Sequence, residues 1–346
     1  MEWVEREFAN LRASFRWTAD HDELECAVAI AAHTAMLTMA MQRFEPVGWV
    51  EEILPAATAA EVEQLPRLYT AACVCALTGR PEVAVGYAQR AHALEEDPRF
   101  DPFESGWSRA WEAFGHRYCG RIDKMFEICE ALAHQPGLAH VIGLVLPLTV
   151  LPGVGRSEEA LTLAKPAMAA ARALGNPYWI AFALTGYARA YADSDPALAM
   201  DTMRDALEYD RQQRLVFFEV NLIRDMAGLQ EALGKPERAL ELLDTAVALF
   251  HRAGNHASVA TTLALVAVLF SRLEQPTIAA TIYGMSTQHG ISMVVHLPEV
   301  LEQLRAALGE ERFDMRVAAG SAMEFDEAMN YDRREIAHAR REIASS

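Results

Sequence analysis

A short corner motif recurs along the sequence at a nearly constant spacing. Its clearest copy is Leu-Gly-Lys-Pro at residues 233–236. The glycine can adopt the left-handed backbone that ends one helix, and the fixed φ of the proline suits the first turn of the next. The candidate corners lie roughly 40 residues apart, a period typical of stacked helical pairs. They are centred on Gly79, Gly120, Gly155, Ser194, Gly234 and Glu274.

The helix after each corner carries a common pattern. Positions five, nine and twelve residues beyond the corner share one helical face. Most are small or apolar, and small residues let a neighbouring helix approach closely. In chain order they are Ala84, Ala88 and Ala91; Met125, Cys129 and Leu132; Ala160, Ala164 and Ala167; Ala199, Met203 and Ala206; Ala239, Leu243 and Ala246; Ala279, Tyr283 and Ser286. We therefore expect an α-solenoid, with an alanine-rich bundle of similar-length helices as the alternative.

The two ends of the chain depart from this period. No stretch alternates long enough to predict a strand, so the expected fold class is all-α. Amphipathic patterns predict end helices over residues 4–17, 24–41, 297–308, 310–317 and 322–343. Terminal segments of this kind typically seal a stack. The predicted division is an N-terminal helical segment at 1–60, degenerate repeats at 61–290 and a C-terminal helical cap at 291–346.

Composition and charge limit the classes of partner. The chain is 52% hydrophobic and 23% charged, as soluble globular proteins are, and its formal net charge of −17 repels phosphate backbones and anionic lipid. The most apolar run, residues 141–154, is shorter than the roughly 20 residues that span a bilayer, and Pro147 and Pro152 interrupt it. We expect no direct nucleic-acid partner and no membrane partner. Five scattered cysteines and a charged N-terminus without a signal-peptide pattern favour a cytoplasmic location.

The sequence carries none of the catalytic or cofactor motifs that we sought. The string nearest to a phosphate-binding loop, residues 228–236, has one residue too many between its glycines, and a proline follows Lys235. The patterns GxGxxG, HExxH and GxSxG and the EF-hand loop do not occur. Paired carboxylates such as Asp201 with Asp205 are common on acidic helix surfaces without catalysis. We expect a protein that is not an enzyme and holds no cofactor or metal.

The predicted binding face is the concave groove lined by the first helix of each pair. Asn221 and Arg224 lie one helical turn apart there and could together hold a carboxylate or a peptide backbone. The alternative for Arg224 is a surface ion pair with a neighbouring acid. Aromatic residues at 107, 111, 114 and 118 form either core or a ligand platform. The candidate groove residues are Tyr69, Trp107, Phe114, Arg117, Tyr191, Asn221 and Arg224.

The corner pattern resembles the tetratricopeptide repeat. The glycine of that family and its three small or apolar second-helix positions match Gly234, Ala239, Leu243 and Ala246. The resemblance implies a right-handed superhelix of stacked helix pairs with a concave binding surface.

Segments at the two ends resemble a narrower family. The string EREFANLRASFRWTAD at residues 5–20 is similar to the start of the helical C-terminal half of large bacterial signal-transduction ATPases. Residues 279–290 and 304–336 look like the closing segment of that half. In the family, an ATPase core precedes such repeats, and an adenylate cyclase, another sensor domain or a LuxR-type DNA-binding domain accompanies it. The sequence here contains no such core, cyclase or DNA-binding region, so the resemblance implies a detached sensor module or a part of a longer product.

These observations predict a non-catalytic protein-interaction or sensor module in bacterial signal transduction or transcriptional regulation. Its partner would be a protein or peptide, and an ATPase or cyclase core is one candidate. Such a stack would act by changing its curvature when a partner bridges several helix pairs. The alternative is a receptor that binds a small molecule or peptide in the concave groove.

Overall fold

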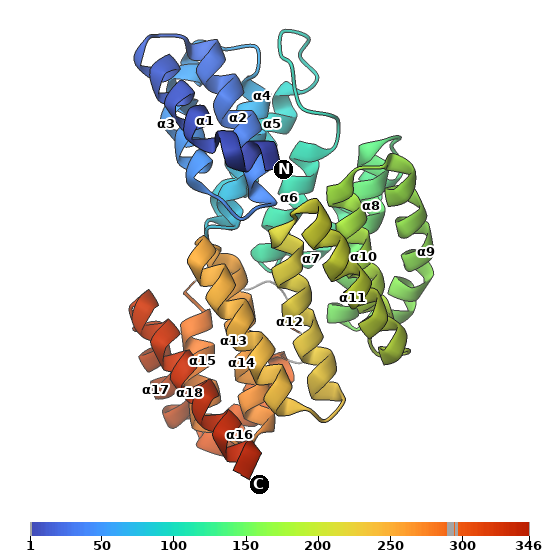
Figure 1. Ribbon diagram of the computed structural model, residues 1–346, viewed down its shortest axis with the longest axis vertical. Coiled ribbons are helices and arrows are strands. Elements are labelled where there is room, and N and C mark those ends of the chain that lie inside the picture. The colour runs from blue at the N-terminus through green and yellow to red at the C-terminus, as the bar shows by residue number, and fades with distance from the viewer. Residues whose placement is uncertain (1, 289–293, 295–296, 346) are drawn as a thin grey trace.

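The computed structural model describes residues 2–288, 294 and 297–345, which form an all-helical chain without a β-strand among them (Figure 1). The first three helices are α1 (Glu2–Asp20), α2 (Leu24–Met39) and α3 (Glu45–Ala59). Helix pairs follow: α4 (Leu65–Ala72) with the 3₁₀ helix η1 (Cys73–Ala76) and α5 (Pro81–Leu94); α6 (Trp107–Tyr118) and α7 (Ile122–Ala133); α8 (Leu138–Leu148) with η2 (Leu151–Val154) and α9 (Ser157–Leu174); α10 (Pro177–Tyr191) and α11 (Pro196–Gln213); α12 (Val216–Ala232) and α13 (Pro236–Ala253); α14 (His256–Arg272) and α15 (Pro276–Ser286). The last helices are α16 (Leu297–Leu308), α17 (Glu310–Ser321) and α18 (Phe325–Ser345). Helices adjacent in sequence pack against each other, which confirms the predicted all-α class.

The predicted corners lie between helical segments and share a backbone geometry. At Gly234 the φ angle is +71°, and the N–H of Lys235 donates to the carbonyl of Gln230 at 2.9 Å. A hydrogen bond of the same span closes the corners at positions 79, 120, 155 and 274. Ser194 differs, because there the N–H of Asp195 donates to the carbonyl of Tyr191 and the Asp195 side chain caps α11. The capping carboxylate replaces the left-handed residue at this corner.

The faces that follow the corners are buried between helices. Every residue of the six predicted triplets is buried except Tyr283, which is partly exposed. On α5, α9 and α13 the alanines have no accessible surface, because their methyl groups lie directly against neighbouring helices. The small residues of the corner pattern therefore set how closely helices pack.

The C-terminal helices follow the predicted pattern closely. Helix α16 matches the predicted range, Gly309 separates it from α17, and α18 packs against α13 and α15. Helices α15 and α17 cross at a pair of glycines. A methyl group on Gly284 would lie 2.1 Å from the carbonyl oxygen of Val317, and one on Gly320 would lie 2.0 Å from that of Thr281. Only glycine permits this approach, since both neighbours are backbone atoms.

Contacts between distant parts of the sequence bring the middle of the chain back to the N-terminal helices. The N–H of Phe217, at the start of α12, donates to the carbonyl of Ala40 at 2.9 Å. The amide nitrogen of Asn255, just before α14, donates to the side-chain oxygen of Gln42 at 3.0 Å, and both side chains are buried. In Figure 1 the blue N-terminal helices accordingly lie beside the start of α12 and α14, and the green helices lie on the other side of α12.

The apolar run at residues 141–154 and the five cysteines all lie among the described residues. Residues 141–154 form most of α8 and the whole of η2, as a buried helix ending in a loop would. Within the described ranges, no helix is both long and apolar enough to cross a bilayer. All five cysteines are free thiols, and Cys26 is exposed.

Candidate functional site

A pocket of about 380 Å³ lies among the helices α10 to α14, which supply most of its lining residues. Its walls come from α12 and α14, from the first half of α13, and from the segments that end α8 and α10. At one end it meets a narrow recess of about 20 Å³ between α6, α10 and α12. Arg117, Arg189, Arg224 and Thr261 line both spaces, so the recess and the larger pocket share one wall.

The aromatic side chains of α6 and α10 form the back of the recess. The rings of Phe114 and Phe182 lie 5.6 Å apart between centroids, and Phe182 lies 5.2 Å from Phe218 of α12. Further from the recess, Trp107 packs on fully buried Trp179 at 5.6 Å. The aromatic stripe is thus mostly core, as one of the two interpretations predicted, and its inner members also line the recess.

Three arginines from different helices meet where the recess opens into the pocket. Arg189 donates from Nε to Oδ2 of Asp225 at 2.7 Å and from a terminal nitrogen to the carbonyl of Thr149 at 3.0 Å. Arg224 lies 3.4 Å from Oδ1 of the same aspartate. Arg117 reaches the hydroxyl of Thr149 at 3.5 Å. The side chains of Arg189, Asp225 and Arg224 are 18%, 12% and 8% exposed, so the cluster is largely shielded from solvent.

The electrostatic state of this cluster follows from its burial. Burial, aided by the positive charges of Arg189 and Arg224, lowers the pKa of Arg117 to about 10 against the opposing effects of Tyr118 and Asp225. Burial likewise lowers the pKa of Arg224. Burial would raise the pKa of Asp225, but the charges of Arg189 and Arg224 outweigh it and lower that pKa. At neutral pH the cluster therefore holds three cations and one anion.

The rest of the pocket is mainly apolar. Leu243 of α13 and Leu265 and Leu269 of α14 contribute to its walls, with Met203 of α11 opposite. The outer margin of the pocket is polar: Arg272 pairs there with Glu231, and Asp193 lies there as well. The site thus has a cationic inner end, an apolar middle and a mixed margin.

Four of the seven predicted groove residues come together in the recess. They are Phe114, Arg117, Asn221 and Arg224. The amide of Asn221 donates to the carbonyl of Phe217 at 2.7 Å, so part of its hydrogen-bonding capacity is used within α12. Arg224 does lie 3.4 Å from a neighbouring acid, Asp225, but the pair is largely buried and is not the surface ion pair of the alternative interpretation.

The other three predicted residues lie outside the pocket walls. Tyr69 belongs to the N-terminal core, where its hydroxyl lies 3.0 Å from that of Thr58. Trp107 packs on Trp179, and Tyr191 packs on Tyr187 at 4.8 Å. None of the three contributes to either of the two spaces described above.

Arg189 and Asp225 are site residues that the sequence interpretation missed. Arg189 sits in the string Tyr-Ala-Arg-Ala-Tyr, where a single charge stands among apolar residues of a helix. That pattern is a usable signal, because an isolated arginine on a buried face needs a partner or a ligand. Asp225 directly follows Arg224, and nothing in the local pattern indicates that it faces Arg189.

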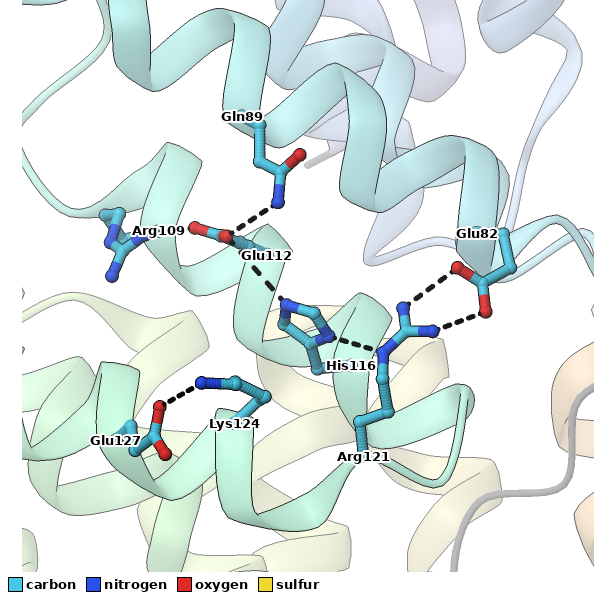
Figure 2. A network of polar contacts seen from close by, with 8 residues as sticks. All are labelled: Glu82, Gln89, Arg109, Glu112, His116, Arg121, Lys124 and Glu127. Carbon is cyan, nitrogen blue, oxygen red and sulfur yellow. Dashed lines mark hydrogen bonds and ion pairs between the residues drawn. The ribbon is translucent and has the colours of Figure 1, made fainter.

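Figure 2 shows a second polar cluster, which involves α6 together with α5 and the start of α7 and has a different composition. Buried Glu112 pairs with Arg109 and accepts a hydrogen bond from Gln89 of α5 at 3.2 Å. Arg121 donates from Nε to Nδ1 of His116 at 2.8 Å and pairs through its other nitrogens with Glu82. Cations and carboxylates alternate along this network, which joins α5, α6 and α7.

Comparisons with known proteins add no assignment. No family model matches the sequence, and no curated protein matches it. Among the described residues, no group of three or more His, Cys, Asp or Glu side chains is placed to hold a metal ion.

Proposed function

We propose that the chain is a non-catalytic sensor module in which a right-handed, tetratricopeptide-like α-solenoid holds a small molecule or a short peptide in its inner pocket. The pocket of about 380 Å³ that opens onto the arginine-lined recess carries this proposal. Its volume lies within the roughly 300–1,000 Å³ of small-ligand sites. A module that bound partner proteins only through its outer surface would have no need of an interior site of this size.

The recurring corners support the solenoid part of the proposal. In all but one of the successive helix pairs the same backbone turn joins the first helix to the second, and the second helix buries the same small-residue face. Each pair hides its apolar side against its neighbours, as the units of a stacked array do. The proposed hand and the tetratricopeptide likeness follow from the sequence resemblance.

Signalling would use the contacts that join distant helices. The pocket is lined by α12 and α14, and the starts of the same two helices contact the N-terminal segment at Ala40 and Gln42. A ligand that favours one spacing of these helices would shift that contact, and hence the surface offered to a regulated protein such as an ATPase or cyclase core. The setting in bacterial signal transduction or transcriptional regulation rests on the resemblance of the two end segments.

Blocking the pocket with a side chain tests the proposal. Gly228 lies on α12 in the pocket wall, and no atom would contact a Cβ placed there within 4 Å. Gly86 on α5 has the same open surroundings but lies outside the pocket. We would screen organic acids, amines, sugars, nucleotides and dipeptides by thermal shift on wild type, Gly228→Phe and Gly86→Phe.

The expected result is a saturable rise in melting temperature with wild type and Gly86→Phe and none with Gly228→Phe. At a ligand concentration one hundred times the Kd, binding stabilises the folded state by about 2.7 kcal/mol. A panel without any active compound would refute the proposal, and so would an active compound that stabilises Gly228→Phe as much as wild type.

A further inference from the structure

The inner end of the pocket has more positive than negative charge. Arg189 and Arg224 share the carboxylate of Asp225, and Arg117, which reaches the hydroxyl of Thr149, adds a third positive charge beside them. The remaining charged residues of the pocket wall lie at its outer margin, where Arg272 pairs with Glu231 and Asp193 adds a further acid. The cationic excess is therefore local, within a chain whose formal net charge is −17.

Such an excess is costly in a shielded site. Cations removed from water lose hydration, and like charges repel more strongly where the effective dielectric constant is low. Asp225 is held by Arg189 at 2.7 Å and lies 3.4 Å from Arg224, so one carboxylate is divided between two guanidinium groups. A bound anion would lower the free energy of this arrangement by supplying further acceptor oxygens.

The shape of the site narrows the class of anion. The recess of about 20 Å³ has room for little more than one water-sized group, since a single water needs about 10–15 Å³ by the same measure. A planar carboxylate presents its two oxygens edge-on to guanidinium forks, whereas a phosphate is bulkier and tetrahedral. Beyond the arginines, Leu243, Leu265 and Leu269 offer apolar contact.

We propose that the pocket binds an organic acid in which one carboxylate is joined to an apolar body. The carboxylate lies against Arg117, Arg189 and Arg224, and the body lies along the leucines of α13 and α14. This inference rests on the proposed sensor function and specifies its ligand class. Both an acyl acid and the C-terminal residue of a short apolar peptide have this chemistry.

Four probes with the same chain and different heads test the assignment. Octanoate, octanol, octylamine and octyl phosphate are titrated into the full chain by calorimetry, together with N-acetyl-leucyl-leucine as free acid and as amide. We expect octanoate to bind at least about tenfold more tightly than octanol or octylamine, because a hydrogen bond to a charged group contributes about 1.5–3 kcal/mol. A free dipeptide acid that outbinds both its amide and octanoate would also support the proposal and would identify the source as a peptide.

Arginine variants locate the head group. Arg117→Met should weaken octanoate binding at least about tenfold and leave octanol binding unchanged. Arg117→Lys, which keeps the charge without the fork, should give an intermediate affinity. Arg204→Met is the matched control, because Arg204 is exposed on α11 and pairs there with Asp201 at 2.9 Å. The unliganded Arg117→Met protein should still unfold cooperatively, so that a lost octanoate response reports on the binding site and not on the fold.

Several results would overturn the carboxylate assignment. These are octanoate binding no tighter than octanol, octyl phosphate binding more tightly than octanoate, and an unchanged octanoate affinity in both Arg117 variants. In each case, the sensor function would still be supported if a neutral or cationic ligand bound to Gly86→Phe as it binds to wild type and did not bind to Gly228→Phe. Loss of every ligand response would instead refute the sensor function itself.

Discussion

The two sides of helix α6 carry polar clusters that differ in charge balance. Toward α5 and α7, Glu112 and Glu82 pair with Arg109 and Arg121 (Figure 2). In the pocket cluster, Arg189 and Arg224 share the carboxylate of Asp225, and Arg117 lies beside them. Both clusters join several helices and both include buried groups. The first cluster has two carboxylates for its two arginines, whereas the second has one carboxylate for its three, so we expect an anion to bind at the second and not at the first.

This contrast separates a structural network from a binding site on physical grounds. A buried ion pair need not stabilise a fold, but removing one partner leaves an uncompensated charge and is strongly destabilising. In the Glu112 network, removing either partner of an ion pair leaves the other as an uncompensated charge, so either substitution is expected to destabilise the fold. In the arginine cluster, the direction of the change in stability depends on which residue is removed. Removing the aspartate increases the excess positive charge, whereas removing an arginine reduces it.

The largest effect is expected at Asp225. Asp225→Asn keeps a hydrogen-bond acceptor for Arg189 but leaves three partly or fully buried guanidinium groups without an anion. We expect the free energy of unfolding, measured by urea denaturation, to fall by about 3 kcal/mol. Added sodium octanoate should restore more of this loss than it adds to wild type. Equal stability of variant and wild type would show that the cluster carries no uncompensated charge.

Much of the fold could be predicted from the sequence because its determinants are local. Gly234 and Pro236 set a corner whatever lies elsewhere in the chain, and the alanines that follow record the contact with the next helix. The ends of α16 were predicted for the same reason, since Gly309 stops its pattern. Such signals require only a few neighbouring residues.

The site was predicted only in part because its determinants are not local. Counting from the corners selected Arg117 and Arg224, and the structure brings these two residues together in the recess. Tyr69 was assigned to the groove by the same counting, yet it lies in the N-terminal core, because the helices around it pack differently from the later pairs. The contact of Arg189 with Asp225 joins residues of α10 and α12 and depends on how the two helices cross. That crossing is a property of the assembled helices and has no signature in either segment.

A smaller loss is expected in the balanced network. Glu112→Gln keeps an oxygen that can accept from Gln89 but removes the charge that pairs with Arg109. Since the Arg109 side chain is 28% exposed and water can partly solvate it, we expect a loss of about 2 kcal/mol in urea denaturation. Octanoate binding should not change. A change in octanoate affinity would show that the two sides of α6 are coupled.

The smallest effect concerns pH and His116. Burial lowers the pKa of His116 from its ordinary value of 6.5, and the charge of Arg121 adds to this shift while Glu112 opposes it. The unfolded chain therefore takes up this proton at a higher pH than the folded chain does. The contribution of neutral His116 to the free energy of unfolding is present above about pH 6.5. It is lost as the pH falls from there through the lower pKa of His116 in the folded state.

His116→Asn removes this titration and keeps an acceptor for the Nε of Arg121, which lies 2.8 Å from the histidine Nδ1. Between pH 8 and pH 5.5 the free energy of unfolding should fall less for the variant than for wild type, by under about 1.4 kcal/mol, the value of one pKa unit. Octanoate affinity should be the same in both proteins at each pH, because His116 lines neither the recess nor the pocket. Parallel stability profiles would mean that the pKa of His116 is the same in the folded and the unfolded chain. The stability of the balanced network would then not depend on pH through this residue.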